Sequence, residues 1–338
     1  MTLTIAIKNI PKVIAAGIMA LFILSVFCLF YYNLPVHLTS KTGTTDYVWE
    51  KHAYYSKMTE GFGYGRMNNE GFNNLKDYTA EPVDVLLMGS SQMEATNVAQ
   101  NKTTAALLNS KFNESKYVYN IGISGHSLPH IITNLETAIQ YYTPKEYVVI
   151  ETMSIQFSIA SLEDIINSKI QRIPSYDRGI VFRLQKIPYL RLLYKQYKDI
   201  KGNNDDEIPE QVPDISDKEK YSELLDMVMK RLNQTGINNN IKLIVFYHPH
   251  LVLNKDGSAS ANTDTEYLEL FKNACGNNGI YFMDMTGVFT EEYKGSHVLP
   301  HGFANTAVGA GHLNKNGHKI IAAELFKQIN KTTPGSAI

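Results

Sequence analysis

An uninterrupted apolar run near the amino terminus constrains this chain more than any other feature. Residues 13–32 read VIAAGIMALFILSVFCLFYY and carry no charge. Twenty helical residues span about 30 Å, the thickness of the hydrocarbon core of a bilayer. Lys8 and Lys12 precede the run, and positive charge on a short flank favours the cytoplasmic side. The pattern predicts a cytoplasmic tail over 1–12, a transmembrane helix over 13–32, and a larger part on the periplasmic or extracellular side of the cytoplasmic (inner) membrane.

Two other interpretations of this run are a cleaved signal peptide and a buried core helix. A signal peptide has a shorter apolar region that ends in a small-residue cleavage site. The run is longer than that, and the following LPVHLTSKTG offers no clean site. We therefore favour a retained, single-pass anchor.

The composition excludes several classes for the rest of the chain. With 44% hydrophobic residues in 338, the chain can bury a sizeable core and is too apolar to be disordered. Its 32 Lys+Arg nearly balance 33 Asp+Glu, whereas general nucleic-acid binding needs a basic surface. Cys28 and Cys275 are the only cysteines, too few for a disulfide framework or a cysteine-based zinc site. We expect no nucleic-acid partner.

Short apolar runs alternate with helical windows over residues 81–330. The alternation predicts an α/β fold, a three-layer, doubly wound sandwich around a mainly parallel five-stranded sheet. In such a sheet the active residues lie at the carboxyl ends of the strands. The expected strands are 83–88, 116–120, 146–150, 241–247 and 280–283, and the expected helices are 103–111, 127–142, 217–234, 264–275 and 317–330.

Three segments lie outside this alternation. Residues 33–80, the extension, are rich in Tyr, Gly and Asn; we favour an aromatic strap packed on the main domain over a sugar-facing surface. Residues 157–216, the insertion, hold a basic helical stretch at 183–201. Such a charge run is usually a solvated face, and contact with anionic headgroups or a membrane partner is the alternative. Residues 331–338 form a tail.

Two turns that follow strands could carry chemistry. Gly89-Ser90-Ser91 ends the first strand, where a serine is exposed beside free backbone N–H groups; a plain helix cap is the alternative. Residues 120–126 read NIGISGH after the second strand. Glycine lets the backbone approach a ligand closely, although an ordinary strand-to-helix turn also uses glycine.

Histidines supply the candidate bases. His312 lies just before the last helix, from where imidazole can reach a serine at the sheet edge; a structural loop histidine is the alternative. His318 is expected to be packed or solvated. His248 and His301 are expected at the substrate. A metal site at these histidines together with His250 and His297 is disfavoured, because no helical ligand spacing or carboxylate companion accompanies them. We expect no metal and no cofactor.

Together and in this order, these two turns and the segment GHLNKNGH at 311–318 resemble the SGNH (GDSL-type) hydrolase superfamily. In that family a strand leads to a Gly-Asp-Ser turn, a later Ser-Gly turn supplies an oxyanion N–H, and Asp-x-x-His precedes the final helix. The resemblance covers residues 81–330. It implies an SGNH/flavodoxin-like sandwich, a nucleophile at Ser91, an oxyanion hole from the N–H groups of Ser91 and Gly125, and a base at His312.

The sequence departs from the family pattern at two places. Gly309 stands where the family has the aspartate, so the serine and histidine act as a dyad or an acid comes from elsewhere, with Asp284 as our candidate. The family's Gly-x-Asn-Asp turn is replaced by ETMSIQ at 151–156. The oxyanion asparagine is therefore absent, and Gln156 is our candidate for substrate contact in its place.

The resemblance and the anchor imply a function in the cell envelope, in a layout similar to the teichoic-acid D-alanyl transfer protein. We expect serine-dependent transfer of an acyl group, expected to be acetyl, to a cell-envelope or exported polysaccharide, or its removal. The expected partners are the polysaccharide acceptor and a membrane-bound O-acyltransferase that donates the acyl group. The alternatives are a catalytically silent scaffold of such a complex and a lipid esterase.

Overall fold

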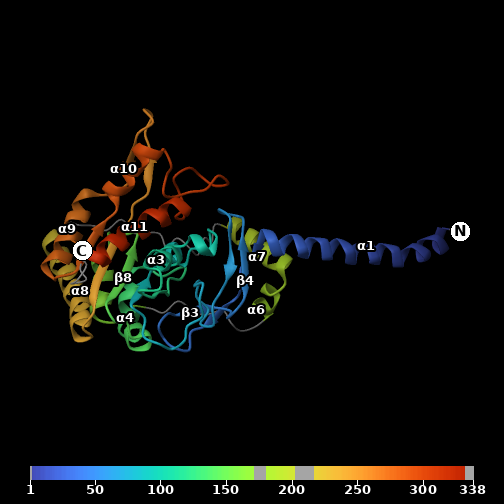
Figure 1. Cartoon of the computed structure of the whole chain (residues 1–338). Coiled ribbons are helices and arrows are strands. Elements are labelled where there is room, and N and C mark those ends of the chain that lie inside the picture. Colours follow the sequence, from blue (N-terminus) through green and yellow to red (C-terminus); the bar gives the residue numbers. More distant parts are fainter. Residues whose placement is uncertain (1, 171–179, 202–216, 332–338) are drawn as a thin grey trace.

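A five-stranded parallel sheet forms the centre of the protein (Figure 1), seen in a computed structural model that describes residues 2–170, 180–201 and 217–331. The strand order is β12-β9-β8-β6-β7, and every neighbouring pair is parallel. This order confirms the predicted doubly wound α/β fold. The strands are β6 (Val85–Met88), β7 (Val118–Asn120), β8 (Tyr147–Thr152), β9 (Lys242–Tyr247) and β12 (Tyr281–Asp284).

Helices cover both faces of this sheet, which explains why its strands are apolar on both sides. Leu86, Val148 and Val245 point to one hydrophobic core, whereas Val85 and Val149 point to the other. The helices of the first core are α4 (Leu128–Tyr142), α5 (Ile159–Ile166), α8 (Lys218–Asn238) and α9 (Thr265–Asn277). Those of the second are α3 (Thr104–Phe112), α10 (Thr286–Ser296) and α11 (Lys315–Lys331).

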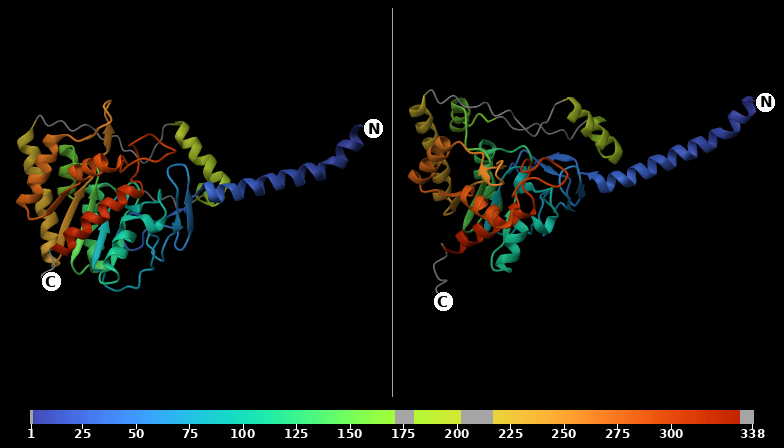
Figure 2. Two further views of the ribbon diagram at one scale, coloured as in Figure 1. Left: turned by 45° about the horizontal axis from the view of Figure 1, so that its top comes forward. Right: turned by 90° about the horizontal axis from the view of Figure 1, so that it is seen from above.

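The amino-terminal helix α1 (Thr2–Tyr31) projects away from this body (Figures 1 and 2). Its segment Asn9–Tyr31 is long and apolar enough to cross a membrane, and only 6% of the most apolar window is buried in the structure. That exposure excludes the buried core helix. A membrane anchor and a signal sequence both fit such a helix.

The extension folds into short antiparallel strands between α1 and the α/β domain. One sheet has the order β1-β4-β5 and a second pairs β2 with β3. The extension is therefore more than an irregular strap, because its β4–β5 hairpin reaches into the α/β domain. The strands are β1 (Tyr32–Asn33), β2 (His37–Thr39), β3 (Tyr47–Trp49), β4 (Tyr54–Lys57) and β5 (Gly63–Arg66).

The described part of the insertion includes two short helices beside α1. Proline lacks a backbone N–H and so begins helices more readily than it continues them. Pro188 accordingly starts α7 (Pro188–Lys201), which splits the expected basic helical stretch in two after α6 (Ile180–Gln185). The linker at 202–216 and the tail at 332–338 lie outside the described residues. Smaller elements are α2 (Ser91–Glu94), η1 (Gln100–Lys102) and the hairpin of β10 (Leu251–Leu253) and β11 (Ala259–Ala261).

The central strand β6 offers a test of this packing. Leu86 is fully buried in the first core, whereas Leu75 in the extension is mostly exposed. We expect Leu86→Ala to lower the free energy of unfolding by about 2–5 kcal/mol, because it leaves a cavity in a dense interior. Leu75→Ala should change it by less than about 0.5 kcal/mol. Urea unfolding of the detergent-solubilised proteins measures both; equal losses would contradict the packing described here.

Candidate active site

Ser91 lies at the carboxyl end of β6, the strand from which the doubly wound sheet diverges in both directions. Parallel sheets place their sites at such a switch point. Ser91 is the first residue of α2, and Ser90 caps that helix by accepting a hydrogen bond from the backbone N–H of Gln92 at 3.2 Å. Ser90 is thus the helix cap that the sequence allowed, whereas Ser91 remains the candidate nucleophile. Ser91 keeps its own hydroxyl free for another partner.

That partner is His312. Its Nε2 lies 2.9 Å from Ser91 Oγ. The loop that carries it is tied directly to the nucleophile helix, because the backbone N–H of Leu313 donates to the side-chain oxygen of Gln92 at 2.7 Å. The structure therefore brings together the two residues predicted as nucleophile and base. His318, one turn into α11, is buried, and its Nδ1 lies 2.9 Å from the Thr104 hydroxyl, as expected for a packed residue.

A glutamate from the extension, Glu60, is the third residue of a row formed with Ser91 and His312. Both carboxylate oxygens of Glu60 lie 2.8 Å from His312 Nδ1, and one of them also accepts the backbone N–H of His312 at 2.8 Å. In this position the carboxylate holds the ring so that Nε2 faces the serine, and it stabilises the imidazolium that forms when the ring takes up a proton. The sequence analysis did not single out Glu60.

The β4–β5 hairpin places Glu60 at its tip. Asn305 accepts the backbone N–H of Gly61 at 2.9 Å and donates to the carbonyl of Met58 at 2.8 Å. On the other side, Asn97 accepts the Lys57 ammonium at 3.3 Å. Gly61 has a φ of +73°, and a Cβ there would lie 2.4 Å from the Asn97 carbonyl. Only a residue without a side chain allows this approach.

Asp284 is not the orienting acid, which corrects the expectation from the sequence. Its carboxylate accepts the backbone N–H of Thr286 at 2.9 Å, at the start of α10, while Glu60 occupies Nδ1 of His312. Gly309 could not supply an acid either. Its φ is +73°, and a Cβ there would lie 2.8 Å from the Leu251 carbonyl. Gly311 leaves the space that Glu60 fills, since a Cβ there would lie 2.5 Å from the Glu60 carboxylate.

Opposing effects set the ionisation of Glu60. Burial alone would raise its pKa, but the hydrogen bond and charge of His312 and the charge of Lys57 lower that pKa to about 2. The Lys57 ammonium lies 3.8 Å from the carboxylate. Glu60 is therefore ionised at neutral pH and can stabilise a protonated His312.

Gly125 lies on a loop that a buried carboxylate holds in place. Glu94, at the end of α2, accepts the Ser124 hydroxyl and the Trp49 indole N–H, each at 2.5 Å. Burial raises the pKa of Glu94 despite these donors. Gly125 has a φ of +78°, and neither its N–H nor that of Ser91 donates to any acceptor in the part of the chain that the structure describes. Their use as an oxyanion hole remains a prediction.

His248 and His301 do not lie on a substrate surface, which corrects a second expectation. Both are buried, with His248 2.8 Å from Glu151 and 3.2 Å from His301. The other oxygen of Glu151 accepts the backbone N–H of Ser90 at 2.7 Å. Burial would raise the pKa of Glu151, but His248 and Ser90 lower it; burial and the neighbouring histidines lower the pKa of His301. The two histidines thus support the nucleophile turn from behind.

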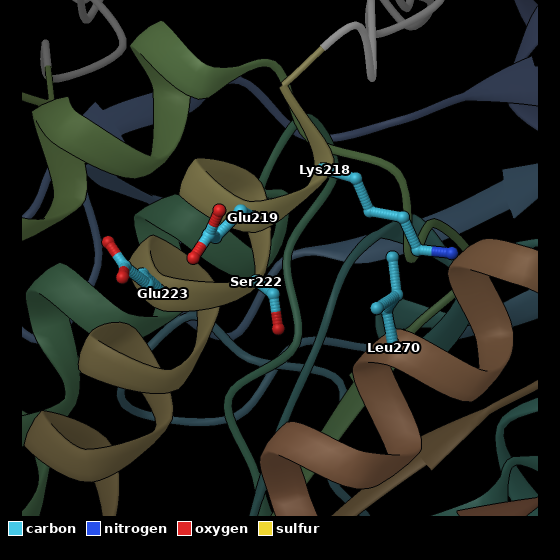
Figure 3. A pocket seen from close by; sticks show the side chains of 5 residues that line it. All are labelled: Lys218, Glu219, Ser222, Glu223 and Leu270. Carbon is cyan, nitrogen blue, oxygen red and sulfur yellow. The ribbon is translucent and has the colours of Figure 1, made fainter.

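Gln156 lies in the loop after β8 and is half-buried. Its backbone N–H and carbonyl both bond to the Ser154 hydroxyl at 3.3 Å. Its contact with substrate stays a prediction. A shallow surface depression lies elsewhere (Figure 3), and none of the predicted site residues lines it; its walls are Lys218, Glu219, Ser222, Glu223 and Leu270 of α8 and α9.

No model of a known protein family matches the sequence, and no curated protein matches it. Among solved structures, the chain is similar to the psychrotrophic esterase EstA from Pseudoalteromonas sp., at 15% identity over 73% of this chain and 97% of that one, with a TM-score of 0.38. It is similar to the acetyl xylan esterase AlAXEase at 14% identity, over 72% and 98% of the two chains, with a TM-score of 0.42. It is also similar to a two-domain esterase active on acetylated mannans, at 9% identity over 77% of this chain and 52% of that one, with a TM-score of 0.42. At this distance the likeness carries no argument about activity, and function is argued from the site.

The orienting role of Glu60 predicts a large kinetic effect. Glu60→Gln keeps the size of the side chain but removes the charge that stabilises the imidazolium. We expect kcat/KM for an activated ester such as p-nitrophenyl acetate to fall by about 10²- to 10⁴-fold. The exposed Glu266→Gln is the matched control and should leave the rate unchanged. Adding Gly309→Asp to Glu60→Gln should not restore activity; restoration would show that residue 309 can serve as the acid.

The lowered pKa of Glu60 also predicts a pH dependence of stability. A carboxyl whose pKa is lower in the folded state stabilises the fold above its ordinary pKa, and this contribution is lost as the pH falls. For Glu60 the window runs from 4.5 down to about 2. We expect the free energy of unfolding of the wild type to fall more steeply over this window than that of Glu60→Gln, measured by urea unfolding. Parallel curves would contradict the ion pair.

Proposed function

We propose that this protein is a serine-dependent O-acyl transferase or esterase that acts through an acyl-enzyme. One observation carries the proposal: Ser91 Oγ lies 2.9 Å from His312 Nε2, and Glu60 lies 2.8 Å from the Nδ1 of the same ring. A nucleophile, a base and a group that orients the base make up the arrangement that activates a serine hydroxyl.

Each atom of the row has a defined part in the reaction. Ser91 Oγ attacks the acyl carbonyl while His312 Nε2 takes the hydroxyl proton, and the backbone N–H groups of Ser91 and Gly125 receive the charge on the carbonyl oxygen. The C–O bond to the leaving alcohol then breaks, and His312 returns the proton to that alcohol. In the second half a sugar hydroxyl or water attacks the acyl-enzyme and its proton passes to His312. The C–O bond to Ser91 Oγ then breaks, and His312 returns the proton to Ser91 Oγ.

We further propose that the acceptor is a cell-envelope or exported polysaccharide, that the acyl group is acetyl, and that a membrane-bound O-acyltransferase supplies it. The proposal includes retention of α1 as an anchor on the cytoplasmic membrane with the site on the outer side, which would hold the site beside such a donor. The end of α1 takes part in the fold, since Ser56 donates its hydroxyl to the Leu29 carbonyl at 2.6 Å and Met58 donates its N–H to the Tyr31 carbonyl at 2.9 Å. Cleavage before the extension would remove both partners.

Two observations favour the alternative of a silent scaffold: the glycine at 309 and the missing oxyanion asparagine. The structure weakens the first of them. Glu60 now stands where an acid is needed, so the glycine no longer indicates a decayed site. The missing asparagine is the observation that still favours a scaffold. Covalent labelling of Ser91 decides between enzyme and scaffold.

Covalent labelling tests the proposal. We expect a fluorophosphonate to form one adduct on Ser91 of the full-length protein in detergent, located by peptide mass spectrometry. Ser91→Ala should abolish labelling, and His312→Ala should slow it by two or more orders of magnitude, since the hydroxyl loses its base. Ser90→Ala is the matched control and should keep the label, because the Ser90 hydroxyl caps α2 and interacts with Glu151, whereas His312 is bonded to Ser91.

An unlabelled wild type, under conditions that label a known serine esterase, would overturn the enzymatic proposal and favour the scaffold. On unlabelled protein, p-nitrophenyl acetate with and without an acetyl-free polysaccharide separates the two reactions. Transfer gives acetyl esters on the sugar, whereas hydrolysis gives acetate alone. Hydrolysis of long-chain esters, with neither acetylated sugar nor free acetate formed from p-nitrophenyl acetate, would favour the lipid esterase.

A further inference from the structure

Helix α7 packs against the end of α1 from which the chain enters the extension, and α6 packs against α7 (Figures 1 and 2). Arg191 of α7 donates to the side chain of Asn33 at 3.0 Å, and the Lys195 ammonium lies 5.9 Å from the ring centre of Tyr32. Tyr32 and Asn33 directly follow α1. The first residues after the apolar span therefore hold α7 in place.

The orientation of α7 is the reverse of what a water-soluble protein uses. Arg191 and Lys195 are one turn apart on the side that contacts β1. Leu193, Tyr197 and Ile200 are spaced by one and two turns on the opposite side, and all three are exposed, Ile200 by 86%. An amphipathic helix of a soluble protein turns its apolar stripe inward, whereas α7 turns a basic side inward and an apolar stripe outward.

The segment before α7 repeats the pattern. Ile180 and Leu184 of α6 and the following Ile187 are spaced in the same way, and all three are exposed. The neighbouring end of α1 also presents exposed rings, those of Phe27 and Phe30. Two apolar stripes and the apolar surface of the span thus lie together at the place where α1 leaves the membrane.

We propose that α6 and α7 lie in the interfacial layer of the bilayer, with their apolar stripes among the lipid chains. The inference rests on α1 being embedded, as the proposed function has it, and goes beyond it by assigning a second membrane contact. Lipid is favoured over a protein occupant because the stripes continue the apolar surface of the span. Apolar helices in the membrane plane and tyrosines at the headgroup level are what this layer accepts.

The inward basic side predicts which lipids are needed. Arg191 is held by Asn33, Lys195 by the Tyr32 ring, and Lys186 by Glu50 at 3.1 Å. These three cations are engaged by the protein itself, so the apolar stripes supply the attraction. Insertion should therefore persist in vesicles of phosphatidylcholine alone, without phosphatidylglycerol.

Depth-dependent quenching tests the proposal on the full-length protein. Cys28 and Cys275 are first changed to alanine, and single cysteines at Leu193→Cys or Tyr197→Cys carry an environment-sensitive nitrobenzoxadiazole dye. The protein is placed in phosphatidylcholine vesicles with a doxyl quencher near the headgroup end of the lipid chain. We expect blue-shifted emission and a roughly twofold or greater loss of fluorescence at both positions, as for residues buried at the acyl boundary.

Two further positions make the outcomes distinct. Phe22→Cys in α1 reports insertion of the span, and Met227→Cys, exposed on α8 at the far side of the molecule (Figure 1), should stay water-like. Blue-shifted emission at Phe22 with water-like signals at Leu193 and Tyr197 would overturn the proposal and leave a protein partner as the occupant of the stripes. A water-like signal at Phe22 would remove the membrane anchor and the inference with it, while serine labelling would still test the enzymatic proposal.

Discussion

The carboxylate of Glu60 accepts both the ring N–H and the backbone N–H of His312, and the geometry of the site depends on this contact. It fixes the ring plane, the tautomer and the position of the loop at the same time. Three parts of the chain must then stand in register: the turn after β6, the loop before α11 and the tip of the β4–β5 hairpin. The parallel sheet provides the first two, and the extension provides the third.

A carboxyl side chain secures each of these parts. Glu60 holds the base, Glu151 holds the nucleophile turn through the N–H of Ser90, and Glu94 holds the loop of Gly125 through Ser124. Glu94 and Glu151 are buried, and a buried carboxyl group is tolerated only where hydrogen-bond donors surround it. The polar interior therefore makes alternative positions of the three parts unfavourable. The side chains of Ser91 and His312 thus gain fixed positions from these neighbours.

Much of this architecture could be predicted from the sequence, because the signals were local. Buried parallel strands give short apolar runs, and all five predicted strands and the helical windows between them occur in the structure. Ser91 and His312 could be located because each follows a predicted element at the sheet edge. Glu60 could not, since it lies in a segment without periodicity and reaches His312 through a hairpin whose docking depends on Asn97 and Asn305. Asp284 and the histidines at 248 and 301 were misplaced for a related reason: the end of a strand fixes the edge on which a residue lies, but not whether its side chain faces solvent or interior.

The hydrogen bond from Met58 to the last residue of α1 lies two residues from the acid of the site. With α1 in a bilayer, this short connection fixes the height of the reacting serine above the membrane surface. A soluble enzyme meets its ester by diffusion through a volume, whereas a site held at constant height meets a membrane-borne donor by diffusion in a plane. Effective concentration rises when a short tether confines two reactants to the same layer. If the acceptor is a polymer, as proposed, it would have to come down to the membrane, and its modification would be confined to chains passing close to that surface.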